Sequence, residues 1–474
     1  MPGGSSISGM AWWRTIRNDA IVNKPGTDLK IVGFLLIALF ICGNADTSPA
    51  LADSGAAPAQ ADTSENLFNN IETKWGGYIK CRGTVSWPGD DSFYGLVGTG
   101  TYYYGSAEGR LKNRLYCGSS VYLDTHYEII FSGGDTRKKQ KELEKLPAGS
   151  VIENYLSGEV EDDRRLMDLT KTLEDHDDHI LYHRLDRLSL TVQQRRFVVR
   201  LGRQAVTWGS GFLFNPMDLF NPFAPTDIER EYKIGDDMAQ VQMSFGESGD
   251  AQFLYVPRRD PSTGKVEGSQ DSLAGKIHFA KGTTEFDIMA AKHFEEQVLG
   301  AGCLGYLGDA AWRLNATWTF PDEKSDESNF LSLVANTDYS WIWWNKNFYG
   351  FVEAFYNGLG DDNYSESIMD NGVMERLGRG ELFTLGRYYL GGHIRMELHP
   401  LVNIFFTVIN NMEDPSGILQ PRLTWDITQD LQLTCGGNIC YGGRGTEYGG
   451  FKIPSTDILI KTPDSFYMWI AWYF

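Results

Sequence analysis

The sequence predicts an all-β fold: a transmembrane antiparallel up-and-down β-barrel of about 18 strands with long outer loops. Three observations predict it. They are an N-terminal export signal, runs of roughly ten residues that alternate apolar and polar side chains, and an apolar final strand that ends at Phe474. The expected organisation is a signal peptide over 1–52, a flexible periplasmic leader over 53–70 and an outer-membrane barrel over 71–474.

The export signal centres on residues 31–42, which read IVGFLLIALFIC. A transmembrane helix needs ~20 apolar residues, whereas the apolar core of a signal peptide needs roughly 7–15, so this run fits a signal peptide. Basic residues between Arg14 and Lys30 precede the run. Ala50-Leu51-Ala52 follows it as a small-x-small cleavage pattern, and we expect cleavage after Ala52.

Alternation continues along the rest of the chain, for example over residues 387–398. In a soluble sandwich the apolar face would point inward, and in a membrane barrel it points to lipid, so alternation alone does not decide between them. The last strand distinguishes the membrane barrel from the soluble sandwich. Its outward residues resemble the C-terminal signal by which outer-membrane barrels are recognised for insertion, and this assembly signal comprises Phe466, Met468, Ile470, Trp472 and Phe474.

Counting strands back from Phe474 gives eight tight periplasmic turns, the first of them expected near Leu123-Asp124. Longer outer connections lie between the turns. The second, about 134–177, carries the basic stretch RKKQKELEKL and then Leu166, Leu169 and Leu173 at helical spacing. We expect it to form a small helical cap or to fold into the pore.

The most distinctive stretch is RLGRQAVTWGSGFLFNPMDLFNPFAPTDIERE, residues 200–231. Its Asn-Pro turns stiffen the third outer loop, about 209–237, because proline fixes the backbone. We therefore expect this loop to fold inward and narrow a pore. The stretch resembles porin-like outer-membrane families with Gly-Arg-Gln, Trp-Gly and Asn-Pro-x-Asp motifs, and the matching residues are Gly202, Arg203, Gln204, Trp208, Gly209, Asn215, Pro216 and Asp218. That resemblance implies a channel or an exporter and names no ligand.

Candidate pore residues combine this stretch with lumen-facing charges of later strands. They are Arg200, Arg203, Gln204, Trp208, Asp218, Arg387, Arg395, Glu397 and Arg422. Opposed charges would set a transverse field that selects small polar solutes. Two alternatives stay open. The charges can hydrate the wall or pair across strands, and Arg203, Gln204 and Asp218 can anchor the loop to the barrel wall.

Composition excludes several function classes. A net charge of −19 and a pI of about 4.9 disfavour a nucleic-acid partner. The six cysteines form no CxxCH or CxxC pattern, which argues against attached haem and zinc ribbons. Cys81 and Cys117 could form a disulfide. The better interpretation is that these cysteines are small side chains at crowded positions of the barrel. No GxSxG motif is present, so we expect no enzyme and no cofactor.

The run Glu174-Asp175-His176-Asp177-Asp178-His179 carries metal-binding residue types. Consecutive residues of a strand point to opposite sides, so we interpret the run as a solvated acidic loop and expect no metal.

The function predicted from these observations is an outer-membrane channel for small polar or charged solutes. The alternative is a barrel sleeve around multihaem cytochromes, which would need no haem motif of its own. Expected partners are outer-membrane lipids, lipopolysaccharide and the barrel assembly machinery, with multihaem cytochromes under the alternative.

Overall fold

The computed structural model describes residues 71–145, 162–227, 232–322, 327–454 and 456–474. The expected signal peptide and periplasmic leader lie outside the described residues, so their boundaries stay predictions.

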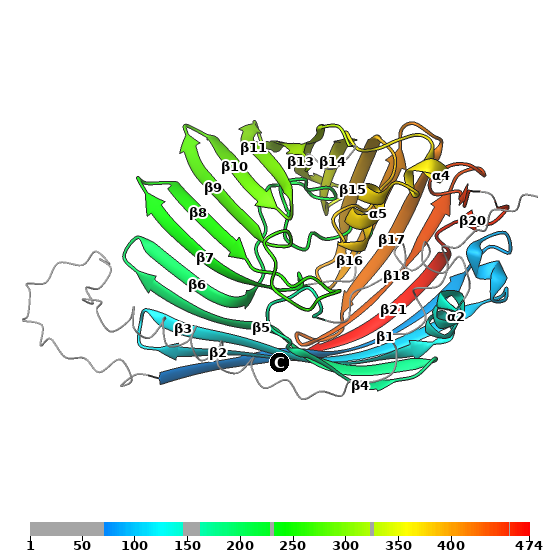
Figure 1. Ribbon diagram of the computed structural model, residues 1–474, viewed down its shortest axis with the longest axis horizontal. Coiled ribbons are helices and arrows are strands. Elements are labelled where there is room, and N and C mark those ends of the chain that lie inside the picture. The colour runs from blue at the N-terminus through cyan, green and yellow to red at the C-terminus, as the bar shows by residue number, and fades with distance from the viewer. Residues whose placement is uncertain (1–70, 146–161, 228–231, 323–326, 455) are drawn as a thin grey trace, which may run out of the picture. The chain divides into compact units, whose positions relative to one another are not determined.

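Within the described residues, a 19-stranded sheet comprises 18 barrel strands and one short extra strand, β4. The strand pairings of this sheet are antiparallel, and β1 pairs with both β2 and β21, which closes the barrel. Figure 1 shows the strands side by side in one curved wall. The predicted fold class is confirmed. The wall strands are β1 (Ile71–Trp87), β2 (Tyr102–Cys117), β3 (Val121–Gly134), β5 (His179–Gln194), β6 (Phe197–Gln204), β7 (Asp236–Phe245), β8 (Gly249–Val256), β9 (Ser272–Lys281), β10 (Thr284–His293), β11 (Glu296–Leu307), β12 (Ala310–Phe320), β13 (Phe330–Trp343), β14 (Lys346–Asn357), β15 (Tyr388–His399), β16 (Val402–Asn411), β17 (Ser416–Asp426), β18 (Leu431–Tyr441) and β21 (Asp464–Tyr473).

The remaining elements belong to the outer connections. They are the 3-10 helix η1 (Phe93–Leu96), the helices α2 (Asp135–Glu144), α4 (Tyr364–Ser367) and α5 (Asn371–Gly378), and the short strands β4 (Thr170–Asp175), β19 (Phe451–Lys452) and β20 (Leu459–Ile460). None of the described helices is both long and apolar enough to cross a membrane. One apolar cluster at the outer end joins these connections and includes Phe93, Leu143, Tyr364 and Phe451.

One edge of β5 pairs with two different strands. Residues 188–194 of β5 pair with β6, whereas residues 180–184 pair with β4 on the same edge. The reason is that β6 ends at Gln204, where the chain leaves the wall as the third outer loop. Strand β4, supplied by the second outer loop, therefore satisfies backbone groups of β5 that β6 leaves open.

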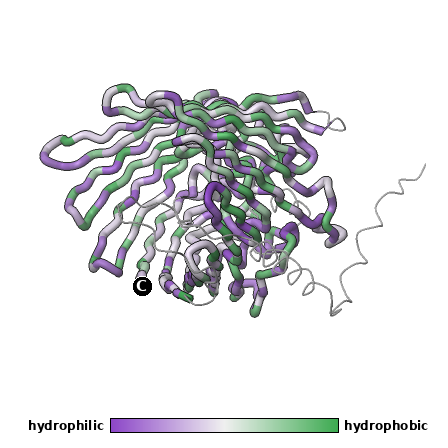
Figure 2. Tube along the Cα trace, turned by 90° about the vertical axis from the view of Figure 1, so that its left-hand side faces the viewer, coloured by the Kyte–Doolittle hydropathy of each residue, from purple (hydrophilic) through white to green (hydrophobic). Residues whose placement is uncertain are grey.

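Side chains alternate as expected, with the apolar set pointing outward. In β15, Leu390 and Ile394 are exposed, whereas Tyr389, the residue before Leu390, points to the other face and is buried. Along the whole sheet, hydrophilic and hydrophobic residues alternate in Figure 2. Many of the exposed side chains are large and apolar, which a soluble protein avoids and a lipid-facing barrel surface requires.

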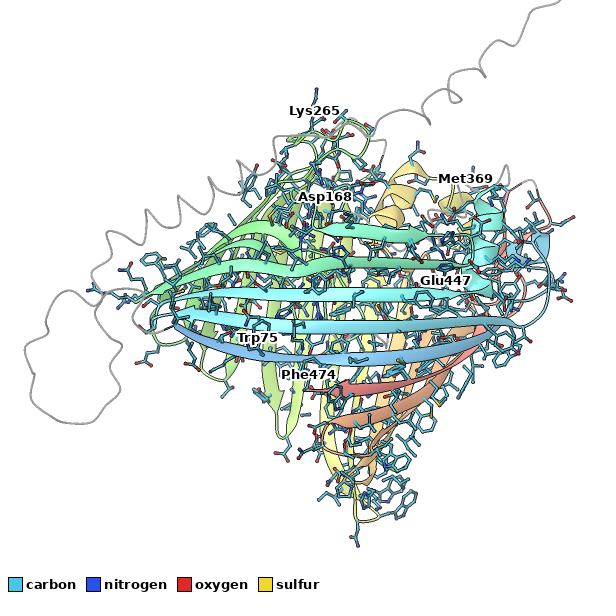
Figure 3. The ribbon with its side chains drawn as sticks, turned by 90° about the horizontal axis from the view of Figure 1, so that it is seen from below. Trp75, Asp168, Lys265, Met369, Glu447 and Phe474 are labelled. Carbon is cyan, nitrogen blue, oxygen red and sulfur yellow. The ribbon has the colours of Figure 1, made fainter. Side chains whose placement is uncertain are left out.

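Phe474 completes the closure of the barrel. Its carbonyl accepts a hydrogen bond of 2.9 Å from the Gly77 N–H, and its own N–H donates to the Gly77 carbonyl at 3.1 Å. Phe474 and Trp75 lie toward the opposite end of the strands from Glu447 and Met369 (Figure 3). The outward set of the last strand, from Phe466 to Phe474, is exposed as the proposed assembly signal needs.

Two local expectations are corrected. The first tight turn lies at residues 118–120, where Gly118 takes a positive φ of 69°, and Leu123 and Asp124 belong to β3. The basic stretch does form α2, but Leu173 lies in β4, because strand pairing with β5 overrides its helical spacing. Cys81 pairs with Ala107 and Cys117 with Ile71, so the two thiols sit far apart in register and both are free.

The closure contact predicts that deleting Phe474 lowers the amount of folded barrel in the outer membrane. The deletion removes two backbone hydrogen bonds at the seam and the aromatic end of the assembly signal. The measurement is heat-modifiable migration of membrane-embedded protein on gels. The Phe474→Tyr variant, which keeps both features, should behave as the wild type. Undiminished folded protein after the deletion would contradict the assignment.

The outward alternation predicts that the same substitution destabilises the barrel to very different extents at two adjacent positions. Ile277 in β9 is 47% exposed, and His278 next to it faces inward and lies 3.1 Å from Asp287. Ile277→Arg should destabilise the barrel by ~2–4 kcal/mol, because it places a charge in hydrocarbon. His278→Arg keeps an acidic partner and should cost much less. Unfolding by denaturant in lipid vesicles measures both, and equal losses would show that the face assignment is wrong.

Candidate functional site

The third outer loop, residues 205–235, joins two neighbouring strands but does not take the shortest path. Gln204 of β6 pairs directly with Asp236 of β7, so a tight turn could connect them. Instead the chain bends at Gly209, where φ is +80° and an added Cβ would meet the Asn215 side chain. The Asn215 amide donates to the Trp208 carbonyl at 2.9 Å, so the predicted Asn-Pro turn folds back on the start of the loop.

The loop is fixed to the far wall of the barrel by a single carboxylate. Glu353 of β14 is fully buried and accepts hydrogen bonds from three consecutive backbone N–H groups, those of Phe212, Leu213 and Phe214, at 2.7, 2.9 and 2.8 Å. The Asn336 side chain donates a fourth, at 3.0 Å. A buried charge is tolerated only when its hydrogen-bonding capacity is satisfied, and these four donors satisfy it.

Aromatic packing reinforces this contact. The Phe212 ring stacks on Phe351 and the Phe214 ring on Phe355, both with ring centroids 4.4 Å apart. Phe351, Glu353 and Phe355 alternate along β14 and therefore share its inward face. Stacked pairs of this kind contribute about 0.5–1.5 kcal/mol each beyond the area they bury. The loop thus lies against the inner surface of β14.

Other parts of the loop contact other strands. The Trp208 indole donates to Gln252 of β8 at 2.9 Å, and Gln420 of β17 donates to the Thr226 carbonyl at 2.9 Å. Tyr232 stacks on Tyr78 of β1 with ring centroids 6.1 Å apart. These partners surround the lumen, so the loop crosses the barrel interior, as it does in Figure 1. The expectation that it folds inward is confirmed.

Asp218 has a partner that the sequence did not indicate. We expected it to lie near arginines of the wall, but its buried carboxylate forms an ion pair with Lys233 of the same loop. The Lys233 ammonium also donates to the Val206 carbonyl at 2.5 Å. Burial raises the pKa of Asp218 to about 6, with Lys233 acting in the opposite direction. Lys233, near the end of the loop, therefore binds both Asp218 in its middle and the Val206 carbonyl near its start.

A cavity of about 140 Å³ lies between this loop and the seventh outer loop, residues 358–387, which joins β14 to β15. Its walls carry apolar groups of the third loop, including Leu213 and Pro222, and polar groups such as Asn357, Glu296 and Arg376. The volume is about ten times the roughly 10–15 Å³ that is needed to hold one water molecule. The cavity therefore suits small polar solutes or ordered water.

The seventh loop is held over this cavity by charge pairs. Arg376 of α5 contacts Glu296 of β11 at 2.6 Å and Glu327 at 2.8 Å. Glu381 contacts His293 of β10 and Arg379, both at 2.9 Å. Burial acts to raise the pKa of Glu381, but Arg379 and His293 together hold it at about 2, so this carboxylate stays ionised.

The structure separates the predicted pore residues into groups. Arg200, Gln204 and Trp208 lie together near the start of the loop, with Arg200 3.4 Å from the Gln204 amide oxygen and 3.1 Å from that of Gln240. Arg203 is on the opposite face of β6 and is 2% exposed, between Asp162 at 2.8 Å and Asp237 at 2.9 Å. Arg203 therefore joins the second outer loop to β7, and its role in a pore or as an anchor of the third loop stays a prediction.

The later residues lie elsewhere. Arg387 is at the outer rim and donates to the Gly360 carbonyl at 3.0 and 2.9 Å. Arg395 lies 5.7 Å from the Tyr349 ring, and Arg422 lies 4.4 Å from the Phe405 ring. Glu397, near the periplasmic end of β15, accepts from Asn347 at 3.1 Å. The nine residues do not form one ring, and their roles in a pore stay predictions.

Sequence reasoning missed Glu353 and Lys233. The signal for Glu353 was available: it is the one charged residue in FVEAFY, between two inward aromatic residues. A lone carboxylate on an otherwise apolar inward face needs donors, and the loop's N–H groups provide them. Nothing local distinguishes Lys233, because its partner is set by how the loop folds.

No family model and no curated protein matches the sequence. Solved structures do match. OccAB2 of Acinetobacter baumannii aligns with a TM-score of 0.50 and 9% identity over 87% of this chain and 99% of its own. OccAB4 of the same organism gives 0.50 and 7% over 85% and 98%. A BenF-like porin from Pseudomonas fluorescens Pf-5 gives 0.48 and 9% over 86% and 100%.

Identities this low establish a shared fold alone. The closed barrel and the match to OccAB2 together define the class: the chain has the fold of the outer-membrane porins. The Gly-Arg-Gln and Asn-Pro-x-Asp resemblance remains a prediction.

The hydrogen bonds to Glu353 predict that Glu353→Gln loosens the loop. An amide offers one acceptor oxygen and turns a donor toward the N–H groups, and each buried N–H left unsatisfied costs about 1–3 kcal/mol. Hydrogen exchange measured by mass spectrometry should be faster over residues 212–214. Glu397→Gln, which removes a carboxylate at the periplasmic end, is the matched control. Equal protection in both variants would mean that Glu353 does not hold the loop.

Proposed function

We propose that this protein is an outer-membrane channel whose third outer loop constricts the lumen. The observation that carries the proposal is the set of hydrogen bonds from Phe212, Leu213 and Phe214 to Glu353 on the far wall. A loop bound in this way reduces the cross-section of the barrel at its own level. A lipid-facing apolar exterior and a polar interior are what such a channel requires.

The proposed solutes are small and polar or charged. Charges of both signs point inward, and several pair across strands: Arg313 lies 2.5 Å from Asp338, and Lys276 lies 3.0 Å from Asp287. Paired charges hydrate the lumen and disfavour apolar solutes. Residues such as Arg395, which is exposed, remain free to set a net selectivity. The cavity of about 140 Å³ beside the loop is the proposed point of entry to the constriction.

The alternative, a sleeve around multihaem cytochromes, needs a lumen wide enough for a second protein. The path of the third loop, from β8 to β14 and on to β17, favours small solutes over a protein guest. We also propose that the barrel is exported and inserted by the assembly machinery through its C-terminal strand. There it would contact outer-membrane lipids and lipopolysaccharide. That the chain is not an enzyme stays a prediction.

The channel proposal predicts a larger pore after loop shortening. Replacing residues 215–225 by a short Gly-Ser linker removes about a third of the loop, including Phe220 and Phe223, and keeps the three residues whose N–H groups bind Glu353. Single-channel conductance in planar bilayers should increase, because conductance grows with the narrowest cross-section.

The matched control shortens residues 260–268, the exposed hairpin that carries Lys265 (Figure 3). Its conductance should equal that of the wild type. A folded 215–225 variant with unchanged conductance would contradict the constriction, and wild-type barrels that conduct no ions would contradict the channel itself.

A further inference from the structure

The tip of the β4–β5 hairpin gathers metal-binding side chains that the channel does not use. The His176 N–H donates to the His179 carbonyl at 2.9 Å, which closes a tight turn between the two strands. Glu174 and His176 are two residues apart and so point the same way, and the turn brings His179 beside them. One ligand atom from each of the three residues lies within 4.8 Å of the others. Residues 174–179 were expected to be a solvated acidic loop. Their alternation instead divides them into two sets, and Glu174, His176 and His179 form the first.

The second set is already occupied. Asp175 pairs with Arg137 of α2 at 2.5 Å, and Asp177 pairs with Lys145 at 3.3 Å. The Arg137 guanidinium also donates to the His176 carbonyl at 3.1 Å. Exposed ion pairs add little stability, but these hold the turn against α2 from its other side. They leave Glu174, His176 and His179 as the group available to a ligand.

Asp178 orients the His179 ring. The His179 Nδ1 lies 2.8 Å from the Asp178 carboxylate, and this hydrogen bond lowers the pKa of Asp178. When Nδ1 donates to a carboxylate, Nε2 carries the lone pair, which is the arrangement that commonly supports a metal-binding histidine. The His179 Nε2 lies 3.5 Å from the Glu174 carboxylate, and the His176 and His179 rings are 4.6 Å apart.

We propose that Glu174, His176 and His179 form a binding site for a divalent transition-metal ion of the zinc class, with Asp178 as a positioning residue. Two ligands of a tetrahedral zinc site lie about 3.3 Å apart, given metal–ligand bonds of about 2.0–2.1 Å. The 3.5 Å separation of the Glu174 oxygen and the His179 nitrogen fits that spacing without rearrangement. Two imidazoles and one carboxylate suit zinc, nickel or copper, whereas calcium and magnesium prefer oxygen ligands.

The site is open to solvent and lies at the tip of the β4–β5 hairpin. The side chains of Glu174 and His179 are 55% and 30% exposed, so an ion can reach them and water can complete its coordination. A bound ion would link β4 to β5, and through the turn to α2. It would therefore stabilise the second outer loop where β4 replaces β6 in the wall. This inference does not depend on the proposed channel.

The test uses the full barrel, purified without a histidine tag and stripped of metal with a chelator. Isothermal titration with ZnCl₂ should reveal one saturable site per chain. His179→Ala and His176→Ala should each abolish or greatly weaken it, and Asp178→Asn should weaken it about 10–100-fold. His183→Ala is the matched control, since His183 lies on the same strand but packs on Tyr127.

Copper offers a second, spectroscopic readout. Cu²⁺ bound at the site should give an electron paramagnetic resonance spectrum with splitting from imidazole nitrogen, and that splitting should change in His179→Ala. Absence of stoichiometric zinc binding would overturn the proposal. So would zinc binding that survives the His176→Ala/His179→Ala double variant, or equally tight calcium binding that depends on Glu174 alone.

Discussion

A strand in hydrocarbon cannot leave its backbone N–H and C=O groups unpaired, and this constraint governs the whole molecule. The barrel meets it by closing β1 on β21, with the final contact between Gly77 and Phe474. Closure also inverts the usual arrangement of a globular protein: apolar side chains face out and polar ones face in. Even where β6 leaves the wall early, β4 takes its place beside β5.

The polar interior makes the inward loop possible. A loop that enters an apolar core would bring unsatisfied N–H groups with it, but here Glu353 accepts three of them. Without the loop, the Glu353 carboxylate would be buried without these donors. Without Glu353, the three loop N–H groups would be buried without an acceptor. The Asp218–Lys233 pair then closes the loop on itself, so its charge is neutralised locally and does not add to the field of the wall.

The sequence predicted those parts of the structure that depend on local patterns. The alternation of residues such as Leu390 and Ile394, the strand count and the stiff Asn-Pro loop all follow from neighbours in the chain. Contacts between distant segments could not be predicted in this way. Leu173 has helical spacing but lies in β4, which pairs with β5, and Asp218, expected beside arginines of the wall, binds Lys233. The positions of Glu353 and of the His176–His179 pair likewise depend on which segments the closed barrel brings together.

The position of the loop inside the barrel is the claim on which the proposed channel depends. It can be tested directly by cross-linking in cells. An added Cβ at Gly391 of β15 would lie 2.3 Å from the Leu213 side chain, so these two positions are in contact across the lumen. In a variant whose native cysteines are replaced by serine, Leu213→Cys together with Gly391→Cys should form a disulfide in the membrane-inserted barrel. Failure to cross-link, with Leu213→Cys instead labelled by an impermeant thiol reagent from the cell exterior, would place the loop outside the lumen.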